Sequence, residues 1–136
     1  MKQKYKVLIV DDEEGIICTL KNHLKLEGYT VDTAQSAAEA YCKVKGDKYH
    51  IVLTDIVMPE MDGIELLKEI KSFDALTQVI MMTGYSTMDK TLRSLEYGAN
   101  DYILKPFKSI EDVIHIIDYS IEKLERWRES IIQIIK

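Results

Sequence analysis

Three short apolar runs restrict the possible folds of this chain more than any other feature of its sequence. They lie within residues 6–10, 50–54 and 79–82. Each run is too short for a buried helix and does not alternate with polar residues, which is typical of strands buried on both faces. Such strands belong to parallel sheets that have helices on either side. The runs therefore predict an α/β fold.

The segments between these runs have the patterns of helices and of two less apolar strands. Tyr29, Val31 and Thr33 alternate with polar residues, as expected of a half-exposed edge strand, and residues 101–104 form a short predicted fifth strand. Four helices are preceded by a residue that can cap a helix start: Ser36, Asp62, Ser86 and Ser109. Two helices are followed by a glycine that can end them, Gly28 and Gly98. Strand and helix alternate five times. The predicted fold is a doubly wound, five-stranded parallel sheet.

Composition narrows the class of protein. At 136 residues the chain has the length of one domain with a substantial core. Its net charge of −5, with no basic cluster, argues against a nucleic-acid-binding surface in these residues. No apolar run has membrane-spanning length, and the N-terminus lacks the apolar core of a signal peptide. Cys18 and Cys42 have no CxxC spacing, so we expect reduced thiols and a cytoplasmic location.

Polar groups able to take part in chemistry follow four of the five predicted strands. The first strand ends at Asp11 and Asp12, the third at Asp55, the fourth at Thr83 and the fifth at Lys105. Parallel strands place their carboxyl ends on one edge of the sheet, so we expect these groups to share a crevice. The simpler interpretation is that such groups are only solvated, and for Asp55 taken alone it is the better one. Four matching strand ends favour a functional site.

These residue types fit one reaction. Three clustered carboxylates repel one another unless a cation lies between them. Mg²⁺ suits a site with few carboxylates, some waters and a phosphate. Asp55 would then attack phosphorus and form an acyl phosphate. Thr83 would donate a hydrogen bond to one phosphoryl oxygen, and Lys105 would neutralise another and reach back toward Asp55.

Six motifs contain or surround these residues: Val10-Asp11-Asp12, Thr54-Asp55, Met58-Pro59-Glu60-Met61-Asp62-Gly63, Met82-Thr83-Gly84, Gly98-Ala99-Asn100-Asp101-Tyr102 and Lys105-Pro106-Phe107. In this order and spacing they resemble the receiver domain of bacterial two-component response regulators, of the chemotaxis-regulator type. The resemblance covers about residues 4 to 120. It implies a flavodoxin-like fold with strand order 2-1-3-4-5, and a signalling domain rather than an enzyme.

The resemblance also implies a role for each site residue. Asp55 would be the phosphoacceptor, and a phosphohistidine on a partner sensor kinase would be the donor. Asp12, Asp55 and the backbone carbonyl of Val57 would hold Mg²⁺, with Asp11 acting through water. Thr83 would be pulled toward the phosphoryl group.

A conformational switch follows from the same resemblance. As Thr83 moves, Tyr102 would swing into the vacated space and repack the surface formed by the fourth helix, fifth strand and fifth helix. The alternative is that Tyr102 is a half-buried edge-strand aromatic that never moves.

The resemblance implies two further features. The bond before Pro106 is expected to be cis. Val57 and Tyr85 occupy positions that tune phosphate lifetime, and neither side chain is the acid or amide that best orients an attacking water. We therefore expect a long-lived phosphoryl group, unless both residues serve only packing.

A helical pattern continues past residue 120, where the last helix of a receiver is expected to end. Its seam alternates by threes and fours through Ile114, Ile117, Ile121, Leu124, Arg128, Ile131 and Ile135. We therefore divide the chain into a receiver domain, residues 1–120, and a helical extension, residues 121–136. The seam is an a/d pattern with one charged interruption, which favours a coiled-coil stalk of a homodimer. The alternative for the residues beyond Leu124 is a linker to an output module. The first three seam residues also have a simpler interpretation, in which they only dock on the sheet.

Other functions fit the sequence less well. A phosphatase or phosphotransferase of the haloacid-dehalogenase type needs a second acid two residues after the nucleophile, where this chain has Val57. A flavin-binding electron carrier needs a hydroxyl- and glycine-rich loop after the first strand, where residues 11–14 are all acidic. A scaffold without phosphoryl chemistry would not need the complete set of site residues. These residues contain no DNA-binding segment, so a transcriptional output requires residues or partners outside them.

Overall fold

Strands and helices alternate along the chain as the sequence predicts. The computed structural model describes residues 2–135, and the side chains of all of these except Tyr85 and Ile135. The elements are β1 (Lys6–Val10), α1 (Glu14–Leu26), β2 (Thr30–Ala34), α2 (Ala37–Gly46), β3 (Ile51–Asp55), α3 (Gly63–Phe73), β4 (Gln78–Thr83), α4 (Met88–Glu96), β5 (Asp101–Leu104) and α5 (Ile110–Ile135). Short 3-10 turns lie at Lys2–Lys4 and Tyr85–Thr87.

The five strands form one parallel sheet in the order β2-β1-β3-β4-β5. The predicted fold class and strand order are therefore confirmed. The chain starts in β1, goes outward to β2, and then crosses back to β3 on the other side of β1. This reversal opens a crevice at the carboxyl ends of β1 and β3, which is where open α/β sheets bind their ligands.

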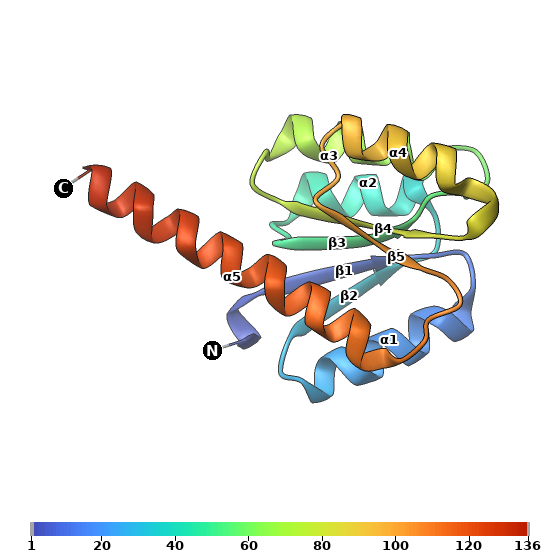
Figure 1. Ribbon diagram of the computed structural model, residues 1–136, viewed down its shortest axis with the longest axis horizontal. Coiled ribbons are helices and arrows are strands. Elements are labelled where there is room, and N and C mark those ends of the chain that lie inside the picture. Colours follow the sequence, from blue (N-terminus) through green and yellow to red (C-terminus); the bar gives the residue numbers. More distant parts are fainter. Residues whose placement is uncertain (1, 136) are drawn as a thin grey trace.

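Helices cover both faces of the sheet, with α1 and α5 on one side and α2, α3 and α4 on the other (Figure 1). Successive strand residues point to opposite faces. On β1, Val7 and Ile9 pack in the core with α1 and α5, whereas Leu8 and Val10 pack in the core with α2 and α3. Both faces of the central strands are thus apolar, which accounts for the uninterrupted runs in the sequence.

Most of the predicted helix boundaries are present. Ser36 Oγ accepts a 3.1 Å hydrogen bond from the Glu39 amide, and Asp62 Oδ1 accepts a 3.0 Å bond from the Glu65 amide. Gly28 has a φ of 103°, a left-handed conformation that glycine adopts without strain after the end of α1. The start signal predicted at Ser86 is wrong.

The hydroxyl at the start of α4 comes from Thr87 instead of Ser86. A 3-10 turn over Tyr85–Thr87 moves the helix start forward by one residue. The Thr87 hydroxyl does not cap α4 but accepts a 3.1 Å hydrogen bond from the Gly84 amide within that turn. The helix then turns an unusual face inward. Its buried residues are Thr91 and Ser94, and none of its residues belongs to either apolar core cluster.

The last helix, α5, continues without a break through residue 120 and projects beyond the sheet (Figure 1). At 26 residues it is about 39 Å long. Ile117 and Ile121 are buried in the core against the sheet. Their assignment to a dimer seam is therefore wrong, because their own domain already covers them. Among residues 2–135, no helix is long and apolar enough to cross a membrane.

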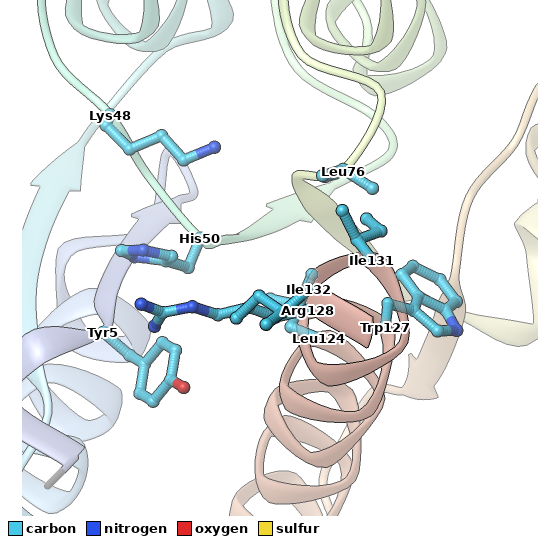
Figure 2. Close-up of a pocket in the computed structure, with 9 residues that line it drawn as sticks. All are labelled: Tyr5, Lys48, His50, Leu76, Leu124, Trp127, Arg128, Ile131 and Ile132. Atoms are coloured by element: carbon cyan, nitrogen blue, oxygen red, sulfur yellow. The ribbon is translucent and has the colours of Figure 1, made fainter. Parts of the chain in front are cut away.

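A groove at the amino edge of the sheet is lined by three further residues of the predicted seam, Leu124, Arg128 and Ile131. The groove measures about 440 Å³ and lies between the far half of α5 and the residues that precede β1, β3 and β4. Figure 2 shows its lining: Tyr5, Lys48, His50, Leu76, Leu124, Trp127, Arg128, Ile131 and Ile132. The side chain of Ile135, also assigned to the seam, lies outside the described residues.

Candidate functional site

Three acids meet in the crevice between the carboxyl ends of β1 and β3. Asp11 and Asp12 follow β1, and Asp55 is the last residue of β3. One carboxylate oxygen from each of the three lies within 4.8 Å of the others. Asp11 is fully buried, Asp55 is half-buried and Asp12 is exposed. The cluster therefore has a buried floor and an open side toward solvent.

Lys105, which follows the edge strand β5, supplies the positive charge of this cluster. Its Nζ donates a 2.7 Å hydrogen bond to Asp11 Oδ2 and a longer, 3.4 Å bond to Asp55 Oδ2. The other oxygen of Asp11, Oδ1, accepts a 2.9 Å bond from the Glu13 amide. Both oxygens of this buried carboxylate are thus hydrogen-bonded, as a buried charge requires.

The backbone around Asp55 depends on a glycine that follows it by eight residues. A Cβ added at Gly63 would lie 2.3 Å from the carbonyl oxygen of Asp55 and 2.9 Å from Cα of Ile56. The Gly63 amide also donates a 2.7 Å hydrogen bond to the carbonyl oxygen of Ile56. The start of α3 therefore packs directly on the end of β3. Only glycine permits this approach, so Gly63 fixes the position of the acid.

Burial and charge act in opposite directions on these groups. Burial raises the pKa of the Asp55 carboxyl, and the negative charge of Asp11 adds to this effect, while Lys105 and the Val57 amide oppose it. Burial alone would lower the pKa of Lys105, but its bonds to Asp11 and Asp55 outweigh this and raise it. The lysine is held in its charged form, but its single positive charge does not balance the negative charges of three carboxylates.

This donor set fits a hard divalent cation. Three carboxylates offer oxygen ligands, the kind that Mg²⁺ prefers, and the exposed side of Asp12 leaves room for waters and a phosphate. A second positive charge in the crevice would also oppose the burial and the Asp11 charge that raise the Asp55 pKa.

The hydroxyl of Thr83 is engaged away from the acids. Thr83 is the last residue of β4, directly beside β3, and is 1% exposed. Its Oγ1 lies 2.7 Å from Thr87 Oγ1 and 2.6 Å from Thr91 Oγ1, both within hydrogen-bonding distance. The sequence analysis missed Thr87 and Thr91. The signal was the repeat of threonine every four residues from 83 to 91, which places the three hydroxyls on one side of the turn into α4.

The remaining predicted residues lie outside the cluster of acids. Tyr102, on the edge strand β5, is 38% exposed, and Val57 is 49% exposed. The peptide bond between Lys105 and Pro106 is cis, as predicted. The side chain of Tyr85 lies outside the described residues, so its predicted effect on phosphate lifetime has no structural counterpart here.

Comparison with known proteins gives one consistent result. A family model described as response regulator receiver domain matches residues 7–118. A receiver domain protein of the CheY-like type from Methanospirillum hungatei JF-1 has a similar crystal structure, with a TM-score of 0.86 and 34% identity. The match covers 90% of this chain and 97% of that one.

Curated relatives include longer proteins. The transcriptional regulatory protein ZraR of Klebsiella oxytoca is 41% identical over 104 residues, which are 76% of this chain and 24% of the relative. The alkaline phosphatase synthesis transcriptional regulatory protein PhoP of Bacillus subtilis (strain 168) is 36% identical over 106 residues, which are 78% of this chain and 44% of the relative. The chain thus spans less than half of either relative.

Proposed function

The chain belongs to the family of response regulator receiver domains, and from this premise we propose that Asp55 is its phosphoacceptor. Receiver domains of two-component systems are phosphorylated on an aspartate and signal to output domains. One observation carries the assignment to this residue. Asp55 is the half-buried member of the cluster of three acids, and it is also within reach of Lys105.

Receiver domains bind Mg²⁺ at their acidic pocket, and in this chain we assign the ligands to Asp12, Asp55 and the backbone carbonyl of Val57. Asp11 is assigned to act through water, since both of its oxygens already accept hydrogen bonds within the protein. When bound, the cation supplies charge neutralisation and polarises the phosphoryl oxygens.

The phosphoryl transfer itself needs few protein groups. A carboxylate oxygen of Asp55 forms a bond to phosphorus while the bond from phosphorus to an imidazole nitrogen of the donor histidine breaks, and the imidazole leaves with the electron pair. The donor is a sensor histidine kinase. Lys105 neutralises one phosphoryl oxygen, and Thr83 donates a hydrogen bond to another.

The receiver is a signalling domain, and we assign it at most weak self-phosphorylation and autodephosphorylation. Val57 and Tyr85 offer no acid or amide to orient water, which favours slow autodephosphorylation.

The signal leaves the site through α4, β5 and α5. We assign the switch to Thr83 and Tyr102, which would turn inward from its exposed position on β5. Phosphorylation would shift an existing equilibrium between two packings of this surface. The partner that responds is an output domain or another protein. A sensor kinase acting inside the cell implies a cytoplasmic chain, and the free thiols of Cys18 and Cys42 fit such a compartment.

We also propose that two copies pair through α5 beyond Leu124, so that residues 1–120 act as the receiver and 121–136 as the stalk. Ile131 and Ile132 are 45% and 44% exposed, and Ile134 is 83% exposed. The same chain carries these apolar side chains and an apolar groove beside them, so a two-fold pair can bury both. A linker to an output module is the alternative.

The experiment that tests the main proposal is incubation with a small acyl-phosphate donor, followed by intact mass measurement. We expect the protein to gain one phosphoryl group in the presence of Mg²⁺ and none when the metal is chelated. Asp55→Asn should gain none, while Asp101→Asn, a partly buried acid of β5 outside the cluster, should behave as the wild type. Equal uptake by Asp55→Asn would refute the assignment.

A further inference from the structure

Three threonine hydroxyls connect the end of β4 to α4. Thr83 Oγ1 lies 2.7 Å from Thr87 Oγ1 and 2.6 Å from Thr91 Oγ1, and it also donates to the carbonyl oxygen of Gly84 at 3.3 Å. Thr83 and Thr91 are each 1% exposed. No water competes for bonds this deeply buried, so the group holds the hydroxyl of Thr83 on the α4 side.

The proposed function requires the Thr83 hydroxyl to bond the phosphoryl group instead. In the proposed reaction Thr83 donates to a phosphoryl oxygen on Asp55, and a hydroxyl has a single hydrogen to donate. Within the threonine group that hydrogen goes to Gly84, Thr87 or Thr91, so Thr83 must give up the bond that it donates there before it can donate to the phosphoryl group. The free energy of that bond opposes the phosphorylated arrangement.

Helix α4 depends on the same hydroxyls. Its buried residues are polar, Thr91 and Ser94, and its leucines face outward, with Leu92 60% exposed and Leu95 39% exposed. The helix contributes nothing to the apolar core clusters of the described residues. With so little apolar burial, the hydrogen bond between Thr91 and Thr83 is a main link between α4 and the sheet.

We propose that Thr91 is a positioning residue that holds Thr83 in the unphosphorylated arrangement and, through the same bond, anchors α4. This inference rests on the proposed function, because it concerns the same site. When Thr83 turns to the phosphoryl group, α4 loses this anchor. Thr91 thereby sets both how readily the site accepts a phosphoryl group and how freely α4 moves afterwards.

The test measures the affinity of the Mg²⁺-loaded protein for trifluoroberyllate, a phosphoryl analogue, by titration calorimetry. Thr91→Val keeps the shape of the side chain and removes its hydroxyl. We expect it to bind the analogue about fivefold more tightly, the equilibrium factor of about one hydrogen bond, because more of the protein is then in the binding-competent state. Thr91→Ser restores the hydroxyl and should restore the wild-type affinity.

Ser94→Ala is the matched control. Ser94 is also buried on the inner side of α4, but its hydroxyl donates a 2.7 Å bond to the Thr91 carbonyl oxygen and does not touch Thr83. We expect its affinity for the analogue to equal that of the wild type, although its unfolding midpoint falls. A purely structural role for Thr91 would likewise lower the midpoint and leave the affinity unchanged.

Two failures are distinguishable. If the wild type binds the analogue and Thr91→Val binds it equally or more weakly, the role of Thr91 is overturned while the proposed function stands. If the wild type does not bind the analogue with Mg²⁺, the proposed function is contradicted and the inference falls with it.

Discussion

Lys105 Nζ donates a hydrogen bond of 2.7 Å to Asp11, a buried carboxylate 94 positions away in the sequence, and lies farther, 3.4 Å, from Asp55. The lysine follows β5, which β4 and β3 separate from β1 in the sheet, yet its Nζ contacts the acid that follows β1. It stabilises the buried acid first and leaves Asp55 only partly neutralised. That division suits a site in which Asp55 reacts and Asp11 supports it.

Replacing this lysine should make the protein depend on metal. Lys105→Met leaves three acids without a positive charge, so we expect the free energy of unfolding in chelator to fall by about 1–3 kcal/mol. Because the same acids then attract a cation more strongly, Mg²⁺ should raise the melting temperature of the variant more than that of the wild type. Lys108→Met, at an exposed position with no ion pair among the described residues, is the control. Equal responses to Mg²⁺ in both variants would contradict the role of Lys105 as the counter-charge of these acids.

Adding one methyl group at Gly63 should disturb the end of β3. The Cβ of Gly63→Ala would lie 2.3 Å from a backbone oxygen of Asp55, so α3 or β3 must shift. We expect a loss of at least about 1–3 kcal/mol in a denaturant titration. Gly15→Ala is the control, because nothing lies within 4 Å of its added Cβ in α1. The control should gain up to about 1 kcal/mol from helix propensity. Similar stabilities for the two variants would contradict the close packing at Gly63.

The stability of the domain should fall as His50 takes up a proton. Burial lowers the pKa of His50, with Lys48 adding to the effect, and Nδ1 of His50 accepts a 3.0 Å hydrogen bond from the Lys6 amide. The unfolded chain binds this proton near its ordinary pKa of 6.5, while the folded chain resists it to lower pH. The contribution of the neutral ring is therefore complete above pH 6.5 and is lost progressively below it.

The comparison is between wild type and His50→Asn, whose amide oxygen can still accept a bond but cannot titrate. Urea titrations from pH 7 downward should show a steeper loss of stability in the wild type than in the variant. Parallel curves would mean that His50 has the same pKa in both states.

The single tryptophan reports on the proposed pairing of α5, because Trp127 lines the groove. Sedimentation of the wild type should show a dimer, and Trp127 emission should shift to longer wavelength on dilution as the groove opens to water. Ile131→Asp should give a monomer with the emission of the diluted wild type. Leu26→Asp changes an apolar residue that is 83% exposed at the end of α1, and should leave the dimer intact. A wild type that stays monomeric at high concentration would exclude the pairing.

The sequence predicted the strands because their residues are apolar on both faces. Val7 and Ile9 face one core and Leu8 and Val10 face the other, so no alternation interrupts the run. The sequence also predicted that α1 ends at Gly28, because the left-handed conformation that ends a helix depends only on neighbouring residues. The strand order itself came from the family resemblance.

The sequence did not predict contacts that depend on tertiary packing. Leu92 and Leu95 suggest an apolar inner face for α4, yet Thr91 and Ser94 are buried, because Thr83 needs hydroxyl partners there. The sequence analysis placed Ile117 and Ile121 in the dimer seam, although both pack in the core. The spacing of apolar residues along α5 is the same before and after the helix leaves the domain. The spacing therefore does not show at which residue α5 leaves the sheet.

The central claim is that Asp55 carries the phosphoryl group. An acyl phosphate is reduced by borohydride to an alcohol, so a phosphorylated aspartate becomes homoserine, which peptide mass spectrometry can locate. After treatment with an acyl-phosphate donor and Mg²⁺, the account predicts homoserine at position 55 alone. Homoserine at position 11 or 12, or at no aspartate of a protein that has gained a phosphoryl group, would contradict it.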